Sequence, residues 1–487
     1  MDSASVTLAL TVTFFVVDFV IRIGAIIVIP RNRKPGSATA WLLLVMFVPY
    51  VGAILYLLIG SPHLPRERRE KQREINTFIL DTTEGMDRVT HDPERPTWLN
   101  SVVELNRTLG AMPLVGGNQT RLYGEYEESI AAMTDAVTNA QRYVHAQFYI
   151  FALDDTTRPF FDALAAAKKR GVVVRVLLDH VASLRSPGYF RTRRFLRKAG
   201  IDARLLLPIQ PWKGKYQRPD LRNHRKLLVI DGNLAFMGSQ NMVDRTYNTA
   251  INRRRGLKWQ DLMVRLRGPI VAGINAIFIT DWYGETGELL TRETEPITDE
   301  DDPRYVDCQV VPSGPGFDGE NNLRLFNSLL YSAQEKIIIT SPYFVPDESM
   351  LIAITTAVQR GIHVELFVSE IGDQILVYHA QRSYYEALLR AGVIIWMYKA
   401  PYILHAKHFT IDDDVAVIGS SNMDIRSFSL NLEVSLMVPD RRFVAQMREV
   451  ENRYRKNSRQ LMLEDWQEQP LHSTVLDNLA RLTSALQ

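Results

Sequence analysis

The stretch His224–Asn241 reads HRKLLVIDGNLAFMGSQN, and a second stretch, His405–Asn422, reads HAKHFTIDDDVAVIGSSN. Histidine, lysine, aspartate, glycine, serine and asparagine stand at the same offsets in both stretches. Chance does not match six polar or special positions in two distant parts of one chain. The repeat therefore predicts a duplicated site whose two copies work as a pair.

Each copy predicts a β-hairpin. Lys226–Asp231 and His408–Asp412 are rich in residues that favour strands, and each runs into a turn followed by a second strand that ends in Gly-Ser. Residues i and i+2 of a strand point to the same face, so histidine and lysine emerge together. The asparagine that follows Gly238 or Gly419 can return to that side from the neighbouring strand.

The surroundings of the two motifs repeat as well, in the order strand, helix, strand. The ranges are Tyr143–Phe151, Thr157–Arg170 and Val172–Leu178 in the first half, and Lys336–Tyr343, Ser349–Arg360 and Ile362–Val368 in the second. Alternating strands and helices predict an α/β fold. We expect two pseudo-equivalent α/β/α sandwich domains that meet face to face, each with one motif at the seam.

The beginning of the chain is of another kind. Val6–Ile29 is apolar except for Asp18 and Arg22, and Ala40–Ile59 carries no charge. About 20 helical residues cover the ~30 Å hydrocarbon core of a bilayer, so the two runs predict a transmembrane hairpin with a kink at Pro49. Asp18 and Arg22 share a helix face and can neutralise each other. Buried helices and a signal peptide are disfavoured, since two such runs follow in tandem without a basic leader.

The predicted organisation has four parts. These are a transmembrane hairpin at 1–60, a basic connector and lead-in at 61–118, a first catalytic domain at 119–290, and a second catalytic domain with C-terminal helices at 291–487. The loop between the spans holds Arg31, Arg33 and Lys34, and five basic residues lie between Arg66 and Arg73. The positive-inside rule slightly favours the second segment, and with it the catalytic domains, as cytoplasmic.

Composition excludes several classes of protein. Hydrophobic residues make up 46% of the 487 positions and the formal net charge is +2, which excludes a disordered polyelectrolyte. The single cysteine, Cys308, excludes an intramolecular disulfide and a cysteine-rich zinc site. Each motif histidine stands beside a lysine rather than a second metal ligand, so we expect no metal and no cofactor.

The doubled motif presents two imidazoles, two ammonium groups and two amides. Fixed cations and amide donors suit a phosphate whose oxygens become more negative during a reaction. An imidazole can attack phosphorus, and a second imidazole can protonate the leaving oxygen and then deprotonate the incoming one. The residues therefore favour phosphoryl or phosphatidyl transfer.

HxKxxxxD followed by GSQN or GSSN, present twice, resembles the phospholipase D superfamily. The resemblance implies metal-independent phosphodiester transfer through a phosphohistidine, with His224 as nucleophile and His405 as general acid and base. It also implies that the phosphate is bound by Lys226, Lys407, Asn241 and Asn422, beside Ser239 and Ser420. Asp231 and Asp412 would stabilise the turns. Asp261 and Glu433 would each orient the histidine of their own half.

Further segments are similar to the bacterial cardiolipin synthase family. They are the two apolar runs, Asp281–Trp282, Ser341–Pro346 and Asn478–Leu482. This resemblance implies that phosphatidylglycerol donates its phosphatidyl group to a second phosphatidylglycerol, giving cardiolipin and glycerol, in a multi-pass protein of the bacterial plasma membrane with anionic lipid and no nucleic acid as partner. The basic insert Asn252–Lys258 departs from the pattern, and we expect a mobile loop on the substrate side.

Three alternatives remain open from the residues. A phospholipase D hydrolase, or another phosphatidyltransferase such as a phosphatidylserine synthase, would use the same two histidines. A catalytically silent membrane scaffold would require decay of the motifs, and both motifs are intact. A nuclease fits least well, because the net charge is close to zero and an apolar segment precedes the motifs.

Overall fold

The computed structural model describes residues 3–31, 33–61, 64–83, 96–210, 212, 217–290, 305–317 and 319–482. These residues form two compact units, Met1–Leu64 with Arg218–Asp220 and Pro65–Gln217 with Leu221–Gln487. We call the first the anchor unit and the second the catalytic unit. Parts of the expected connector, 62–63 and 84–95, and the start of the expected last domain, 291–304, lie outside the described residues.

The anchor unit contains three helices, α1 (Ser3–Val28), α2 (Pro35–Phe47) and α3 (Pro49–Ile59). The helices of the catalytic unit are α4 (Arg66–Thr82), α5 (Leu99–Gly110), α6 (Tyr126–Thr138), α7 (Arg158–Lys169), α8 (His180–Arg185), α9 (Tyr189–Lys198), α10 (Ala250–Arg254), α11 (Ile270–Thr286), α12 (Asn321–Ser332), α13 (Glu348–Gln359), α14 (Ile375–Arg382), α15 (Tyr385–Ala391), α16 (Ile425–Ser429), α17 (Arg441–Lys456), α18 (Leu463–Gln467) and α19 (Leu471–Leu482).

The strands of the first half are β1 (Leu114–Tyr123), β2 (Tyr143–Phe148), β3 (Val173–Asp179), β4 (Asp202–Leu206), β5 (Arg222–Asn223), β6 (Leu227–Ile230), β7 (Leu234–Gly238), β8 (Lys258–Gln260) and β9 (Met263–Arg267). The strands of the second half are β10 (Val306–Ser313), β11 (Lys336–Thr340), β12 (Phe344–Val345), β13 (His363–Ser369), β14 (Ile394–Tyr398), β15 (Tyr402–Leu404), β16 (His408–Ile411), β17 (Val415–Gly419), β18 (Met423–Asp424), β19 (Asn431–Val438) and β20 (Ser458–Leu461).

The catalytic unit is built on one mixed sheet with internal symmetry. The first half has the order β4-β3-β2-β6-β7-β9-β1, and the second half has the order β14-β13-β11-β16-β17-β19-β10. Corresponding neighbours are parallel or antiparallel in the same way. β1 and β10 pair antiparallel and join the halves. The predicted α/β fold with two pseudo-equivalent domains is therefore confirmed, but the sheets of the two halves join edge to edge through β1 and β10 rather than face to face.

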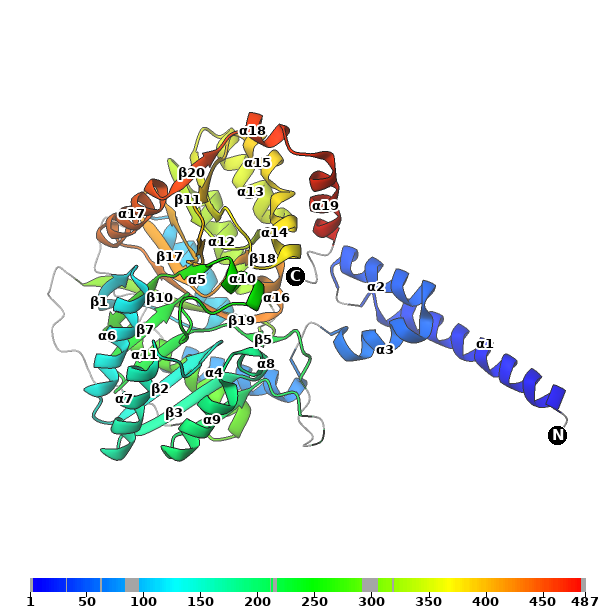
Figure 1. Cartoon of the computed structure of the whole chain (residues 1–487), viewed down its shortest axis with the longest axis horizontal. Coiled ribbons are helices and arrows are strands. Elements are labelled where there is room, and N and C mark those ends of the chain that lie inside the picture. Colours follow the sequence, from blue (N-terminus) through cyan, green and yellow to red (C-terminus); the bar gives the residue numbers. More distant parts are fainter. Residues whose placement is uncertain are drawn as a thin grey trace. The chain divides into compact units, whose positions relative to one another are not determined.

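Helices cover both faces of each half, as Figure 1 shows for the cyan and green first half and the yellow and red second half. In the first half α6 and α7 pack on the sheet through one apolar core. Helix α11 also contacts the strands but contributes no residue to this core. In the second half α12, α13 and α15 share a core with the strands. Because both faces are covered, central strands such as β6 and β16 are buried along their whole length.

One of the two helices expected to span a membrane has the necessary length and apolar composition. Val6–Val28 within α1 is long and apolar enough to cross a membrane. The run expected to form the second span is divided into α2 and α3, both too short to qualify. Pro49 disfavours helical geometry at the preceding residue and donates no N–H, and Val48 has φ −134° and ψ 70°. The expected kink is thus a full interruption.

The basic insert Asn252–Lys258 does not form the loop expected from its sequence. Its first residues belong to α10, and Lys258 begins β8. The Asn252 side-chain amide donates to the carbonyl of Asp373 at 2.9 Å, and Arg255 donates to the carbonyl of Gly372 at 3.4 Å. The insert therefore forms a helix and strand that connect the first half to the second.

Candidate active site

The two halves exchange short strands directly beside both histidines. β5 pairs with β19, and the next residue, His224, donates its N–H to the carbonyl of Leu432 at 2.9 Å. β15 pairs with β8, and the next residue, His405, donates its N–H to the carbonyl of Gln260 at 2.7 Å. Each histidine backbone is thus fixed by the residue that precedes a carboxylate of the opposite half.

Each histidine ring is also held by the opposite half. Nδ1 of His224 lies 3.0 Å from a carboxylate oxygen of Glu433, and Nδ1 of His405 lies 2.7 Å from a carboxylate oxygen of Asp261. The expectation that each carboxylate orients the histidine of its own half is therefore wrong, because the strand exchange crosses the two pairs. With Nδ1–H donated to the carboxylate, Nε2 of each ring keeps its lone pair for chemistry.

The motif serines position these carboxylates from their own half. The Ser239 hydroxyl donates to Asp261 at 2.6 Å, and the Ser420 hydroxyl donates to Glu433 at 2.5 Å. All four side chains are buried. Serine, carboxylate and histidine thus form two hydrogen-bonded chains, each running from one half into the other.

The motif glycines allow the close strand contact that this arrangement needs. A Cβ atom on Gly238 would lie 2.4 Å from the carbonyl oxygen of Leu262, and one on Gly419 would lie 2.3 Å from that of Val434. Only glycine avoids both clashes. The Gly-Ser pair of each motif therefore brings the serine hydroxyl to the carboxylate of the adjoining strand.

The motif lysines are buried beside the histidines. Nζ of Lys226 donates to the carbonyl of His224 and Nζ of Lys407 donates to that of His405, both at 2.5 Å. Lys226 also lies over the Tyr149 ring, 5.4 Å from its centre. Each ammonium group is thus held by the backbone carbonyl of the histidine of its own motif.

Burial and charge set the protonation of the histidines. Burial lowers the pKa of His224 to about 4, with Glu433 opposing the shift and Lys226 adding to it. Burial and the Lys407 charge lower the pKa of His405 to about 4. Both imidazoles are therefore neutral at neutral pH in the empty site. A bound phosphate anion would favour the protonated form of either ring.

The same environment acts on the lysines and carboxylates. Burial lowers the pKa of Lys226 to about 7 and that of Lys407 to about 8, and the charge of Lys407 further lowers the pKa of Lys226. Burial alone would raise the pKa of Asp261 and of Glu433, but the partner histidines and the lysines lower both. The site therefore holds two carboxylates and two lysines, and an anionic ligand would stabilise the positive charge of the lysines.

The motif asparagines occupy different settings. The Asn241 side-chain oxygen accepts the N–H of Ile150 at 3.1 Å, which leaves its amide group as the end that can donate to a ligand. The Asn422 side-chain oxygen is buried without a hydrogen-bond partner among the described residues.

The motif aspartates lie in the hairpin turns. Asp231 accepts the N–H groups of Gln141, Arg142 and Tyr143 at 2.7–2.9 Å. Asp412 likewise accepts three consecutive N–H groups, which belong to residues 334–336, at 2.7–3.0 Å. Both aspartates have left-handed backbones, φ 53° and 49°, which aspartate tolerates better than most residues. Their carboxylates tie each hairpin turn to the start of a neighbouring strand.

Several residues of the site have no counterpart in the sequence prediction. The Tyr149 ring meets the His224 ring edge-on at 5.0 Å, and the Trp259 ring meets that of His405 at 4.9 Å. Arg225, the middle residue of the first motif, is buried and donates to Asp281 at 2.7 Å and to the carbonyl of Glu433 at 3.0 Å. The sequence indicates a role for Arg225 only through its position between His224 and Lys226.

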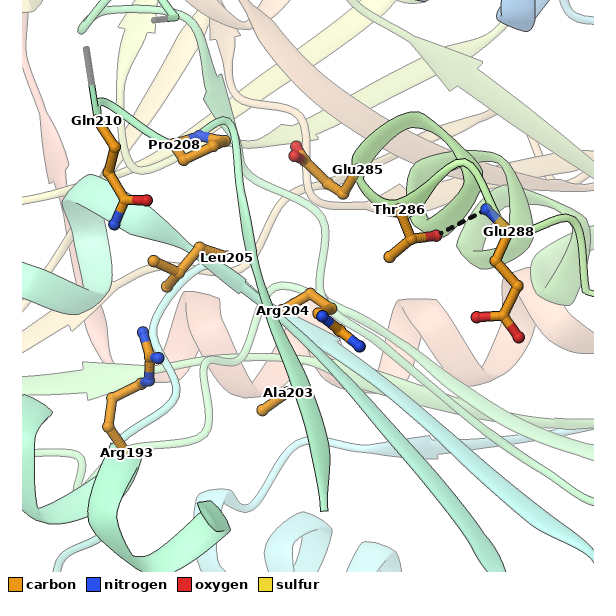
Figure 2. A pocket seen from close by; sticks show the side chains of 9 residues that line it. All are labelled: Arg193, Ala203, Arg204, Leu205, Pro208, Gln210, Glu285, Thr286 and Glu288. Carbon is orange, nitrogen blue, oxygen red and sulfur yellow. Dashed lines mark hydrogen bonds between the residues drawn. The ribbon is translucent and has the colours of Figure 1, made fainter. Parts of the chain in front are cut away.

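A cavity of about 450 Å³ lies elsewhere, between β4 and the C-terminal end of α11. Figure 2 shows Arg193 and Arg204 facing this space from one side, with Glu285, Thr286 and Glu288 on the other. No lining residue belongs to either motif. Among the described residues, moreover, no group of three or more His, Cys, Asp or Glu side chains could hold a metal ion. The doubled histidine site remains the candidate active site.

Comparisons with known proteins agree with this site. The family described as cardiolipin synthase, PLD-like domain, matches residues 133–282 and 326–454, one segment in each half. The family described as phospholipase D-nuclease N-terminal matches residues 20–61. Cardiolipin synthase A of Proteus mirabilis is 32% identical over 471 residues, covering 93% of this chain and 94% of the relative. Cardiolipin synthase A of Pectobacterium carotovorum is 32% identical over 470 residues, covering 94% of both.

A solved structure resembles the fold. Phosphatidylserine synthase of Haemophilus influenzae superposes with a TM-score of 0.60 and covers 80% of this chain and 100% of its own. Its sequence is 14% identical. The likeness concerns the arrangement of helices and strands alone.

Proposed function

This chain belongs to the cardiolipin synthase family of PLD-like proteins, and from that premise we propose that its crossed pair of histidines transfers a phosphatidyl group through His224. The relatives span nearly the whole chain, and the protein is a phosphatidyltransferase that makes cardiolipin. The observation that carries the proposed mechanism is the contact of each histidine Nδ1 with a carboxylate of the opposite half.

The first step forms a covalent intermediate. Nε2 of His224 attacks the phosphorus of one phosphatidylglycerol, and a P–N bond forms as the bond from phosphorus to the headgroup glycerol oxygen breaks. His405 is protonated once the phosphate anion is bound. The leaving oxygen takes this proton from Nε2 of His405, and glycerol leaves. The attack places positive charge on the His224 ring, which the Glu433 carboxylate at 3.0 Å stabilises.

The second step reverses these roles with another lipid. A hydroxyl of the second phosphatidylglycerol's headgroup gives its proton to His405, and its oxygen attacks phosphorus while the P–N bond breaks. Cardiolipin forms, His224 returns to the neutral state and His405 is protonated again. Lys226 and Lys407 stabilise the phosphate oxygens as their charge grows, and Asn241 and Asn422 are placed to add amide donors.

The protein associates with membranes, as its family and its apolar N-terminal helix indicate. Its substrates are phospholipids. We place it in the bacterial plasma membrane with the catalytic unit on the cytoplasmic side, because basic residues follow the apolar segments. A membrane-bound active site also favours a lipid acceptor over water at the covalent intermediate.

The reaction can be tested on the purified full-length protein with phosphatidylglycerol vesicles and excess chelator. We expect equimolar cardiolipin and glycerol. Phosphatidic acid as the main product would instead identify a hydrolase, and serine-dependent phosphatidylserine would identify the other transferase. The matched control is the His224→Asn, His405→Asn double variant, in which neither product should appear.

The pH dependence should report the lysines. Phosphate binding needs protonated ammonium groups, and the pKa values of about 7 for Lys226 and about 8 for Lys407 mean that these charges are lost above those values. We expect kcat/KM to fall as the pH rises from about 7 to about 9, and kcat to fall at higher pH, because bound phosphate keeps the lysines protonated. Lys226→Arg should move the fall in kcat/KM upward, since guanidinium stays charged. A flat kcat/KM over this range would contradict the assignment.

A further inference from the structure

The anchor unit is folded back on itself in a way that its sequence did not predict. The ring centres of Trp41 in α2 and Tyr56 in α3 lie 5.4 Å apart. In one continuous helix, residues fifteen positions apart would be separated by about 22 Å along the axis. A Cβ atom on Gly52 would lie 2.9 Å from Cα of Val45, so α3 packs tightly against α2. We call this pair the α2–α3 hairpin.

The two ends of the α2–α3 hairpin lie together. Arg33, just before α2, donates to the carbonyl of Gly60, just after α3. Its guanidinium also lies over the Tyr56 ring, 5.1 Å from the centre. The chain therefore enters and leaves the hairpin at the same level.

The tip of the hairpin lies beside the middle of α1. The Tyr50 hydroxyl, at the start of α3, donates to the carbonyl of Phe14 at 2.9 Å. Ala25 of α1 and Ile29, the residue after α1, pack with Ala38 and Val45 of α2 in a small core. Figure 1 shows α2 and α3 beside the C-terminal part of α1, whose N-terminal part extends past them. The hairpin thus runs along only part of the segment that is long enough to span a membrane.

Arg22 donates a hydrogen bond to a backbone carbonyl at the tip of the hairpin. Its side chain pairs with Asp18 at 2.7 Å and also donates to the carbonyl of Met46. Met46 lies in the last turn of α2, where carbonyl groups lose their helical partners. An unsatisfied carbonyl inside a bilayer costs several kcal/mol, so a charge pair at this depth has a structural purpose. The contact accounts for the only two charges in Val6–Ile29.

We propose that α1 alone crosses the bilayer and that α2 and α3 form a re-entrant hairpin, capped at its tip by Arg22, that enters and leaves on one membrane face. Arg31, Arg33 and Lys34 then lie on the same face as the basic residues between Arg66 and Arg73. The positive-inside rule assigns this face to the cytoplasm. A two-span arrangement would place these two basic groups on opposite faces.

Cysteine labelling in membrane vesicles tests this topology. In a Cys308→Ala background, Gly36→Cys stands at the start of α2, Ser61→Cys follows α3, and Thr7→Cys stands near the other end of α1. An impermeant maleimide should label Gly36→Cys and Ser61→Cys equally in inside-out vesicles, and Thr7→Cys only in right-side-out vesicles. Labelling of Gly36→Cys and Ser61→Cys from opposite faces would overturn the proposal.

A crosslink tests the fold of the hairpin independently. A short bifunctional thiol reagent should join Trp41→Cys to Tyr56→Cys within one chain, and adding Gly52→Leu should abolish the crosslink because the leucine cannot fit against α2. Lack of a crosslink without Gly52→Leu, in a variant that still makes cardiolipin, would contradict a folded-back hairpin. The inference rests on membrane association rather than on the reaction, so both readouts are separate from product formation.

Discussion

Replacing His224 with asparagine is expected to lower the rate of cardiolipin formation by about 10⁴-fold or more, because the covalent route is lost with the nucleophile. Replacing His405 with asparagine is expected to cost about 10²-fold to 10⁴-fold, the usual contribution of a general acid and base. Initial rates of glycerol release from phosphatidylglycerol vesicles measure both effects. The asymmetry arises from chemistry, since the two rings have closely similar surroundings.

A substrate with a good leaving group separates the two roles. A phosphatidyl p-nitrophenol needs no acid for the first step, so His405→Asn should release a burst of p-nitrophenol and accumulate phosphatidyl-enzyme. His224→Asn should show no burst. Mapping the modified histidine by mass spectrometry under alkaline conditions completes the test. A burst in His224→Asn with the label on His405 would reverse the assignment.

The hairpins of the site could be predicted from sequence because their signals are local. The β-rich residues Leu227–Ile230 and His408–Ile411, each followed by a turn, predict the two hairpins. The histidine and lysine of each motif lie just before these strands. The repeated order of strands and helices likewise determines the sheet, since parallel neighbours need a crossover helix between them. These features depend on a few consecutive residues and can be predicted without knowledge of tertiary contacts.

The crossed pairing of histidines and carboxylates could not be predicted in this way. It depends on β5 and β15, strands of two and three residues that carry no periodic pattern. Asp261 and Glu433 stand near their own motifs in the sequence, yet Leu432 and Gln260 receive the N–H groups of the opposite histidines. Such long-range exchange has no local signature.

The anchor unit shows a similar limit. Pro49 predicts only a kink, and the full interruption that the structure shows depends on how closely α3 can approach α2 at Gly52. Asp18 and Arg22 were recognised as a pair at helical spacing, whereas the contact of Arg22 with Met46 requires the return of the chain. Local chemistry predicted each partner, and tertiary packing decided what it contacts.

Glu433→Gln is expected to lower the rate by about 10²-fold to 10⁴-fold with little change in shape, since the carboxylate stabilises the charge that attack places on the His224 ring. Asp261→Asn is the matched variant and acts on His405 instead. With the p-nitrophenol substrate, Glu433→Gln should lose the burst as His224→Asn does, and Asp261→Asn should keep it as His405→Asn does. Thermal unfolding and partial rescue by Glu433→Asp distinguish this effect from misfolding.

These variants distinguish pairing of each carboxylate with the histidine of its own half from pairing with the histidine of the opposite half. If each carboxylate served the histidine of its own half, Glu433→Gln would behave like His405→Asn and would retain the burst. The crossed contacts at 3.0 Å and 2.7 Å require the opposite grouping. Crossed pairing also predicts that each half is inactive alone, because neither half holds both a histidine and the carboxylate that contacts it. We therefore expect one active site rather than two in the duplicated chain, in which the two histidines become unequal when one of them attacks the phosphate.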